Sequence, residues 1–444
     1  MKLDNRLSFC WLLLFTLPTV FSSIFANLYS TVDGVFIARY VNTDALSGLN
    51  ITLPLTYLTS AFGMMFGSGG NALVAKKFGE GHEVEACEDF SLMMAVAFGF
   101  SMILSILCYI FLDPLCRFLG SNETLLPYCR EYMIPVLMAI PFTVFSSVFQ
   151  LSFITVGKAG LGAFLSVLGG VLNIVLDWLF MGVFGWGLAG AAIATSIGYA
   201  TPSLIGAIFF CVSREQIIHV VRPKWRVRTI IDSCFNGSSE MVSVLAFSVI
   251  TILFNRVLMH LGGSDGVAAL SIIWYAQGLF GGLFRGYING ISSVASYHFG
   301  CGDRERLSQL FSISVRILMT VAAVVTALNY LLGSFVVTFF AKGSDYAAAI
   351  ALHGFYLVAI SFIMMAFNVF ASGWFTALND GRTSAVLSFC RTLIFMVGPV
   401  MVLPRFLGID GVWLSIIAGE ALSFIQSMYY FVKFRGMWQP TIKE

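Results

Sequence analysis

Charged side chains are scarce in this sequence. Asp, Glu, Lys and Arg together make up 11% of the 444 residues, whereas about a quarter is ordinary for a soluble domain. Hydrophobic residues make up 58% of the chain. A soluble core of this size could not shield so much apolar surface from water. The composition therefore excludes an ordinary soluble fold and indicates a protein that is embedded in the lipid bilayer.

Sequence motifs of several catalytic classes are also absent. There is no GxxxxGK(S/T) phosphate loop and no HExxH pattern, the nine cysteines form no CxxC pair, and the histidines lack zinc-type spacing. These absences disfavour ATP-driven transport, a metalloenzyme and a disulfide framework. No nucleophile-and-base pair stands out, and the formal net charge of +2 argues against a nucleic-acid partner. We therefore expect no enzyme and no resident cofactor.

Long hydrophobic segments fill most of the chain instead. A transmembrane helix needs about 20 apolar residues, so a chain of this length has room for about a dozen. The run that follows Lys2 and Arg6 is too long for a signal-peptide core, and we interpret it as the first span. The pattern predicts an all-α polytopic membrane protein with twelve transmembrane helices, at residues 8–38, 46–75, 91–112, 132–156, 162–183, 187–212, 231–260, 266–297, 310–340, 348–377, 384–405 and 410–433.

Basic residues are distributed unevenly among the predicted loops, which indicates the orientation. The longest basic loop runs from Arg214 to Arg228, between the sixth and seventh spans. Because Lys and Arg gather in cytoplasmic loops, we expect both termini in the cytoplasm. With this orientation the outside segments hold few basic residues, namely Arg39, Arg117, Arg130, Lys342 and Arg405.

The two halves of the chain repeat each other at a constant offset, such that position n of the first half aligns with position n + 221 of the second. Phe78, Gly79 and Gly81 fall on Phe299, Gly300 and Gly302. Each half has six spans, so the halves share one orientation and should be related by a pseudo-two-fold axis along the membrane normal, with the substrate site between them. We divide the chain into a six-helix lobe (1–212), a cytoplasmic linker (213–230) and a second six-helix lobe (231–444). Further aligned pairs are Gly69 with Gly290, Thr155 with Thr376, Gly160 with Gly381, Gly187 with Gly408 and Gly198 with Gly419.

Four polar residues in spans of the first half are candidates for a cation-coupling site. Asp33 lies late in the first span and Asp177 late in the fifth, and such a residue costs about 2.5–3.5 kcal/mol on insertion scales. Asn173 lies one helical turn before Asp177 on the same face, and Thr195 lies in the sixth span. Their oxygens can coordinate a hard cation such as Na⁺, or the carboxylates can exchange a proton. Alternatively, the two aspartates cap helix ends at the outer water boundary.

Three further residues each have two interpretations. Pro18 interrupts the first span and is either a hinge that responds to Asp33 or a fixed packing kink. Glu240, at the start of the seventh span, either favours the helix N-terminus or attracts cationic cargo into the cavity. Glu420, in the twelfth span, is either a substrate contact or a fixed structural partner. The candidate basic partners in spans are Arg256, Arg285, Arg316 and Arg391, which the sequence cannot pair.

Several of these motifs occur together across nearly the whole chain. They are Val32-Asp33-Gly34-Val35-Phe36, Gly67-Ser68-Gly69-Gly70, Phe78-Gly79-Glu80-Gly81, Leu172-Asn173 with Asp177, and the run from Gly187 to Thr195. In this combination the chain resembles the multidrug and toxic compound extrusion (MATE) family of antiporters.

The resemblance implies two six-helix lobes around a V-shaped cavity, with export by alternating access. It also implies that Asp33, Asn173, Asp177 and Thr195 form a cation site in the first lobe and that Pro18 marks a bending point. Under the alignment of the two halves, Asp33, Asn173 and Asp177 meet Phe254, Ile394 and Gly398. We therefore expect the cation site in the first lobe only.

We expect a secondary transporter in the inner (plasma) membrane of a bacterium or archaeon that exports lipophilic organic cations in exchange for protons or sodium ions. The 43 Phe and 18 Met residues fit adaptable binding of such cations. We expect a monomer, because two lobes can form the whole pathway. Alternatives are a flippase of lipid-linked sugars, whose anionic cargo would favour basic cavity walls, an unrelated twelve-span carrier and a membrane-embedded lipid enzyme.

Overall fold

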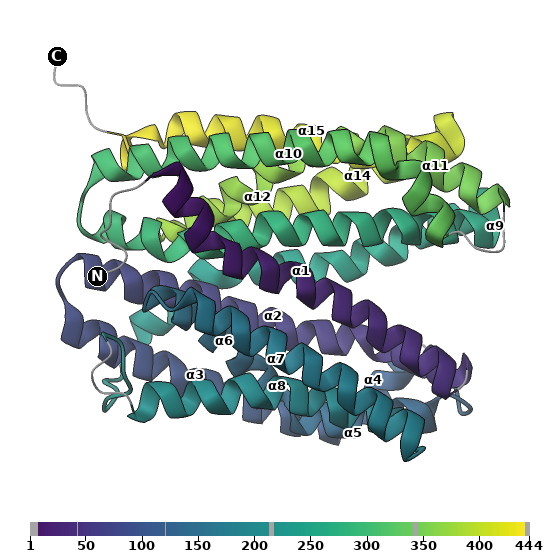
Figure 1. Ribbon diagram of the computed structural model, residues 1–444, viewed down its shortest axis with the longest axis horizontal. Helices are drawn as coiled ribbons and strands as arrows, with labels where there is room; N and C mark the ends of the chain where they lie inside the picture. Colours follow the sequence, from purple (N-terminus) through teal and green to yellow (C-terminus); the bar gives the residue numbers. More distant parts are fainter. Residues whose placement is uncertain (1–7, 42, 120, 213–216, 341–344, 440–444) are drawn as a thin grey trace.

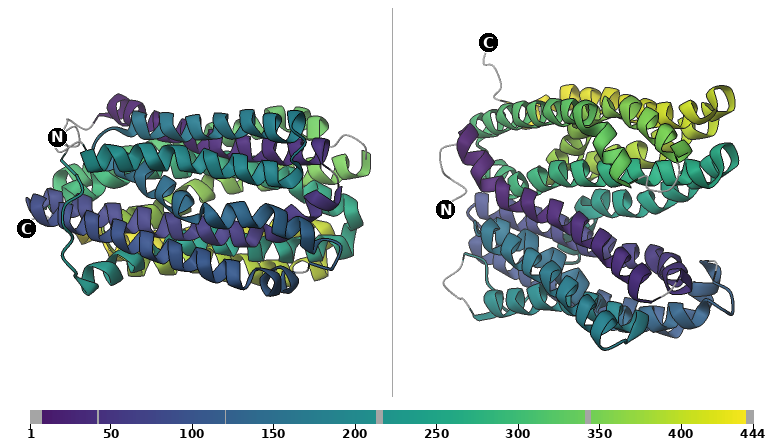
Figure 2. Two further views of the ribbon diagram at one scale, coloured as in Figure 1. Left: turned by 90° about the horizontal axis from the view of Figure 1, so that it is seen from below. Right: turned by 45° about the vertical axis from the view of Figure 1, so that its right-hand side comes forward.

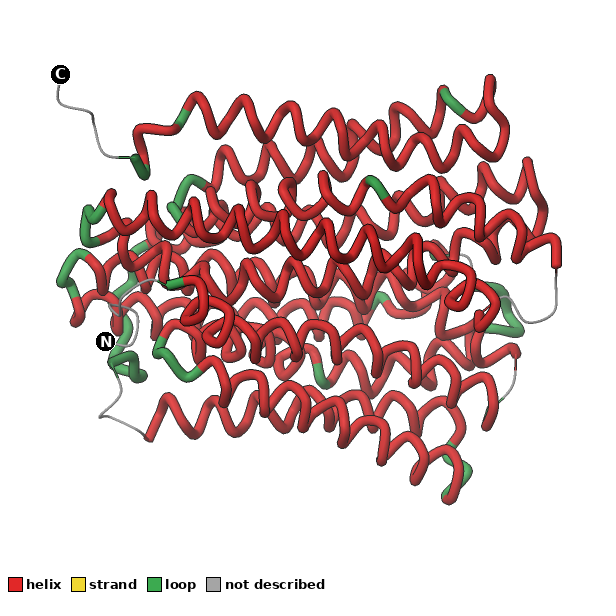
Figure 3. The backbone as a smooth tube through the Cα atoms, turned by 45° about the horizontal axis from the view of Figure 1, so that its top comes forward, coloured by secondary structure: helices red, strands yellow, loops and turns green. Residues whose placement is uncertain are grey.

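Helices make up almost all of the described chain. The computed structural model describes residues 8–41, 43–119, 121–212, 217–340 and 345–439. The side chains of some residues inside helices, Asp33 among them, lie outside this description. Figure 3 shows helices and short loops and no strand in these ranges, so the predicted all-α fold class is confirmed.

The first half of the chain forms the helices α1 to α8, which we call the first bundle (Figure 1). Spans four and five are each built from two consecutive helices. The elements are α1 (Phe9–Tyr40), α2 (Thr43–Gly79), α3 (Glu83–Ile110), α4 (Leu112–Phe118), α5 (Leu126–Met138), α6 (Ile140–Thr155), α7 (Ala159–Asp177), the π-helix η2 (Trp178–Val183) and α8 (Gly187–Val212).

The second half forms the helices α9 to α15, the second bundle. Helix α9 runs through two predicted spans and breaks at Gly263, whose φ is 61°. It begins at Val227, so the last four residues of the predicted linker belong to the helix. The elements are α9 (Val227–Gly300), α10 (Arg304–Phe340), α11 (Asp345–Ala359), α12 (Ser361–Ala377), α13 (Gly381–Phe389), the π-helix η3 (Cys390–Ile394), α14 (Phe395–Val402), α15 (Pro404–Lys433) and the 3₁₀-helix η4 (Arg435–Met437).

The number of helices that could cross a membrane is close to the twelve that the sequence predicts. Among the described residues, 9 helices are long and apolar enough to cross a membrane, and the count reaches 11 when each of two bent helix pairs is one span. The remaining predicted span is α2, whose 37 residues are longer than a bilayer requires. The chain is thus an all-helical, multi-pass membrane protein.

Backbone irregularities recur at the predicted offset of the repeat. Helices α5 and α6 meet at 52° about Ala139, and α11 and α12 meet at 54° about Ile360, the aligned position of the second half. Gly81 and Gly302 are likewise aligned, and their φ values of 82° and 70° are open to glycine without steric cost. The repeat therefore extends from the sequence to the bends of the backbone.

Each bundle has its own hydrophobic core. The buried members of one cluster fall between Ala45 and Ile218. Two other clusters are built from residues from Ala246 onward, with Leu12 as the one buried member from the first half. The first turns of α1 therefore pack against the second bundle, and α1 also packs against α7. Helix α1 thus contacts both halves of the molecule.

The two bundles approach each other very closely where α2 and α9 cross near their C-terminal ends. A Cβ atom on Gly79 would overlap the carbonyl oxygen of Tyr297, and a Cβ atom on Gly300 would overlap the carbonyl oxygen of Lys76. Lys76 and Tyr297 are themselves aligned by the repeat, so the contact is reciprocal. Only glycine allows two backbones to pass this closely, which explains the repeated Phe-Gly motif.

Polar bonds between the bundles occur at the same end. The Thr155 and Ser293 hydroxyls lie 2.8 Å apart, and the Asn379 amide donates to the Ala72 carbonyl at 3.2 Å. This end also holds the first turn of α1 and the last turn of α15 (Figure 1). The ribbons of the two bundles diverge toward the opposite end, as the right-hand view of Figure 2 shows. The bundles are therefore joined at the terminal end and spread at the other.

Part of the basic linker is tied to the first bundle. Arg226, directly before α9, bonds to the carboxylates of Glu88 at 2.8 Å and Asp89 at 3.0 Å. Both acids are buried on α3, and Ile218 of the linker is fully buried in the core of the same bundle. Some of the basic residues of this loop thus neutralise buried carboxylates in addition to indicating the orientation.

Candidate functional site

Three of the predicted cation-site residues lie on two helices that pack very closely. A Cβ atom on Gly169 of α7 would overlap the Gly198 carbonyl oxygen of α8. One helical turn further along α7, the Asn173 amide donates to the Thr195 hydroxyl at 3.2 Å. The glycine contact therefore brings the polar side chains of these two spans within hydrogen-bonding distance.

Asp177 completes this group from the last residue of α7. Its side chain is fully buried, with a relative exposure of 0%, so Asp177 does not cap a helix at a water boundary. Asn173 is 3% exposed, and its side-chain oxygen accepts no hydrogen bond from the described residues. An amide oxygen, a hydroxyl and a carboxylate are hard oxygen ligands, so this set suits a proton or a small cation.

Asp33 and Pro18 both belong to α1. The helix is continuous through both positions, and Pro18 lies within it at a partly buried position. The Asp33 side chain lies outside the described residues. Since α1 packs against α7, the helix that carries Asp33 is a neighbour of the helix that carries Asp177.

The structure corrects the position of Glu240 along its helix. Helix α9 begins at Val227, so Glu240 lies more than three turns inside it, about 20 Å from the helix start at a rise of about 1.5 Å per residue. A carboxylate stabilises a helix dipole only within the first turn, so that interpretation of Glu240 is wrong. Glu240 is half-buried, and the charges of Arg285 and Arg391 both act on it.

Glu420 has fixed partners inside the second bundle. The residue is buried, and Arg391 of η3 donates to its carboxylate from Nη2 at 2.8 Å and from Nε at 3.1 and 3.2 Å. The Asn368 amide of α12 donates to the same carboxylate at 2.7 Å, and Ser427 donates to Asn368 at 3.1 Å. These bonds favour the structural interpretation of Glu420 over a substrate contact.

Arg285 is the residue whose role the sequence did not reveal. It was one of four basic residues in spans, with nothing in the pattern to rank it. In the structure its side chain is exposed although it lies in the middle of the span Asp265–Gly300. Only the packing of spans seven, eight and eleven shows that it shares an electrostatic environment with Glu240 and Arg391.

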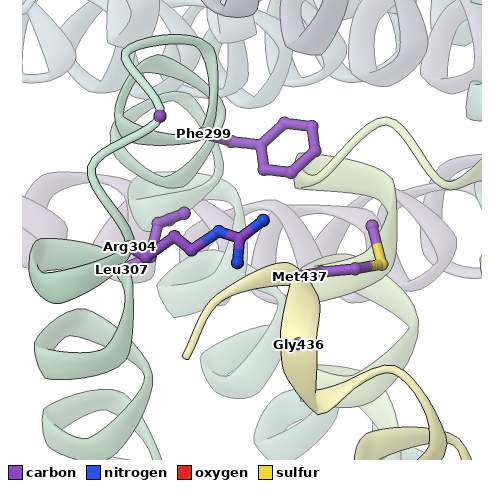
Figure 4. A pocket seen from close by; sticks show the side chains of 6 residues that line it. Phe299, Arg304, Leu307, Gly436 and Met437 are labelled. Atoms are coloured by element: carbon purple, nitrogen blue, oxygen red, sulfur yellow. The ribbon is translucent and has the colours of Figure 1, made fainter. Parts of the chain in front are cut away.

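In the described part of the chain, neither a metal-binding cluster nor the pocket at the terminal end coincides with this group. No group of three or more His, Cys, Asp or Glu side chains in that part of the chain could hold a metal ion. A pocket of about 320 Å³ lies instead at the terminal end of the second bundle, between the start of α10 and η4 (Figure 4). Its lining contains none of the predicted site residues; it consists of Phe299, Gly302, Arg304, Leu307, Gly436 and Met437.

Comparisons with known proteins agree with this architecture. The family model MatE matches residues 18–179 and again residues 241–401, once in each bundle. The multidrug export protein MepA of Staphylococcus haemolyticus (strain JCSC1435) is 21% identical over 428 residues, which cover 95% of this chain and 93% of MepA.

Solved structures share the fold across almost the whole chain. A crystal structure of MATE in the straight conformation superposes with a TM-score of 0.91 at 22% identity and covers 96% of both chains. An outward-facing conformation of a multidrug resistance MATE family transporter of the MOP superfamily superposes with a TM-score of 0.86 at 23% identity, also over 96% of both chains. Since the family model covers most of the sequence and both repeats, this chain belongs to the MATE family of membrane transporters.

Proposed function

We propose that this transporter exports lipophilic organic cations from the cell by antiport with protons or sodium ions. The observation that carries the proposal is the buried oxygen-rich group on α7 and α8. Asp177 and Asn173 are almost completely buried, and the Asn173 oxygen accepts no hydrogen bond in the described chain. A carboxylate or an unbonded amide oxygen is costly in apolar surroundings, so such a group persists where binding an ion or proton is its role.

The shape of the molecule supports alternating access. The bundles are joined at the terminal end and spread at the other, and basic loops support a cytoplasmic position for the termini. With this orientation the bundles spread toward the outside of the cell. Cargo released from between the bundles then leaves the cell, which is the direction that export requires.

Helix α1 provides a physical link between ion and cargo. It contacts the second bundle at Leu12 and at Val20, which lies against Gly286 of α9, and it also packs against α7. Pro18 lies among these contacts and has no backbone donor for the carbonyl one turn earlier, which lowers the cost of bending. A change of charge at Asp33 or Asp177 can therefore shift the outer part of α1 if the two shapes bind the ion with different affinity.

A flippase of amphipathic anionic cargo is the second candidate, because the exposed Arg285 supplies a basic residue on the second bundle. We rank it lower, because Glu240 lies within the electrostatic reach of Arg285 and would repel an anion. The similarity to proteins named for multidrug export also favours the first candidate.

The deciding experiment uses purified protein in liposomes with an imposed proton or sodium gradient and the fluorescent cation rhodamine 123. Wild-type protein should move the dye against its gradient with one of the two ions. Asp177→Asn should abolish gradient-driven movement while the protein stays folded. The matched control is Asp232→Asn, which removes an exposed acid from α9 and should transport normally. Gradient-driven transport by Asp177→Asn would remove this carboxylate from the coupling site.

A further inference from the structure

Glu240 lies on the inner side of α9, between its contacts with two other helices. Three residues before it, Gly237 is packed so tightly against the Met65 carbonyl of α2 that it has no room for a side chain. One turn before it, the Asn236 amide donates to the Thr376 carbonyl of α12 at 2.9 Å. Since residues on a helix rotate by about 100° each, Glu240 lies between the side of α9 that faces α2 and the side that faces α12.

Arg285, on the part of α9 that follows the break at Gly263, also lies between contacts with two other helices. Its neighbour Gly286 lies against the backbone of Val20 on α1, with a Cβ position 2.6 Å from the Val20 Cα. Gly281, one turn earlier, lies against Met365 of α12. Arg285 therefore emerges between α1 and α12. Its side chain is exposed at this position.

These two side chains attract each other without touching. The charges of Glu240 and Arg285 act on one another, yet no carboxylate oxygen of Glu240 lies within 4.0 Å of a guanidinium nitrogen of Arg285. Neither side chain forms a hydrogen bond or an ion pair within the described chain. Arg391, the third charge in the group, is already paired with Glu420. The Glu240 carboxylate and the Arg285 guanidinium thus remain available to bind a charged ligand.

We propose that Glu240 and Arg285 form a paired-charge site for zwitterionic cargo, namely an aromatic organic cation that also carries a carboxylate. The cationic group lies against Glu240, and the carboxylate accepts two parallel hydrogen bonds from the Arg285 guanidinium. A cargo with a positive charge alone is attracted by Glu240 and repelled by Arg285. An anion is attracted by Arg285 and repelled by Glu240. This inference rests on the proposed export function and narrows its cargo.

A pair of dyes that differ only at the carboxylate tests this site. Rhodamine 110 carries the cationic ring system and a free carboxylate, and rhodamine 123 is its methyl ester. Binding is measured by fluorescence anisotropy with purified protein in lipid nanodiscs. Wild-type protein should bind rhodamine 110 about tenfold more tightly than rhodamine 123. A difference of this size is expected from one charge-assisted contact between the carboxylate and Arg285.

The variants separate the two charges. Arg285→Gln should remove the preference for rhodamine 110 and leave the affinity for rhodamine 123 unchanged or higher, and Arg285→Lys should restore part of the preference. Glu240→Gln should weaken the binding of both dyes. Arg256→Gln is the matched control, because Arg256 is an exposed arginine on the same helix and should leave both affinities unchanged.

Three outcomes would overturn the paired site. The first is equal affinity of the wild type for the two dyes, and the second is an equal loss of affinity for both dyes in Arg285→Gln. The third is complete displacement of rhodamine 110 by decyl phosphate, which would make Arg285 a plain anion site. Failure of the export function has a different signature, namely no gradient-driven movement of either dye by wild-type protein that still binds them.

Discussion

The glycine contact between α2 and α9 gives a quantitative test of how the bundles are joined. A Cβ atom on Gly79 would lie 2.9 Å from the Cys301 nitrogen and 3.0 Å from the Gly300 Cα, and it would overlap the Tyr297 carbonyl oxygen. Carbon atoms prefer separations of about 3.5–4.0 Å, and the obstacles here are backbone atoms that cannot rotate away. Gly79→Ala therefore forces the two helices apart.

The cost of this change should appear as a shift between conformations. Overpacking of this kind costs about 1–3 kcal/mol, and a shift of that size changes a two-state equilibrium by about 5–150-fold. The strain exists only while the terminal ends of the bundles are in contact. Gly79→Ala should therefore favour the state in which this end is separated and should lower the rate of export.

Hydrogen exchange followed by mass spectrometry measures the effect directly. Amides near residues 72–82 and 296–304 should exchange faster in Gly79→Ala, and Gly300→Ala should show the same change because its Cβ would overlap the Lys76 carbonyl. Gly99→Ala is the control, since nothing lies within 4 Å of its Cβ position on α3. If Gly79→Ala exchanges and exports as Gly99→Ala does, the inferred contact between the bundles is refuted.

Three other predictions concern further residues within the helices. Glu420→Ala should destabilise the protein by about 3–5 kcal/mol in denaturant unfolding, because Arg391 loses a buried partner, and replacing both residues by Met should recover much of the loss. Pro18→Ala should keep dye binding and reduce gradient-driven export, whereas normal export would make Pro18 a packing kink. Asn173→Ala and Thr195→Ala should each reduce coupling in liposomes less than Asp177→Asn, since water can replace a neutral ligand; an equal loss would contradict this ranking.

The cation-coupling group shows how far residue patterns extend into tertiary structure. Asn173 and Asp177 could be placed on one helical face because helix periodicity is local, and the close packing of α7 and α8 brings Thr195 to Asn173. The pattern could not place Glu240 correctly, because the polar start of α9 from Val227 has no hydrophobic signal to mark it. The helix extends beyond the apolar segment into the linker.

The sequence by itself determined the all-helical membrane class, the hydrophobic segments and the constant offset between the two halves. The first two follow from the thickness of the bilayer, which acts on short segments of chain. Only the tertiary structure decided that Arg391 pairs with Glu420 and that Arg285 and Glu240 share one environment across the break at Gly263. The partner of a charged side chain depends on which helices are neighbours and on how each helix is rotated about its axis. Helix periodicity specifies neither the neighbours nor the rotation.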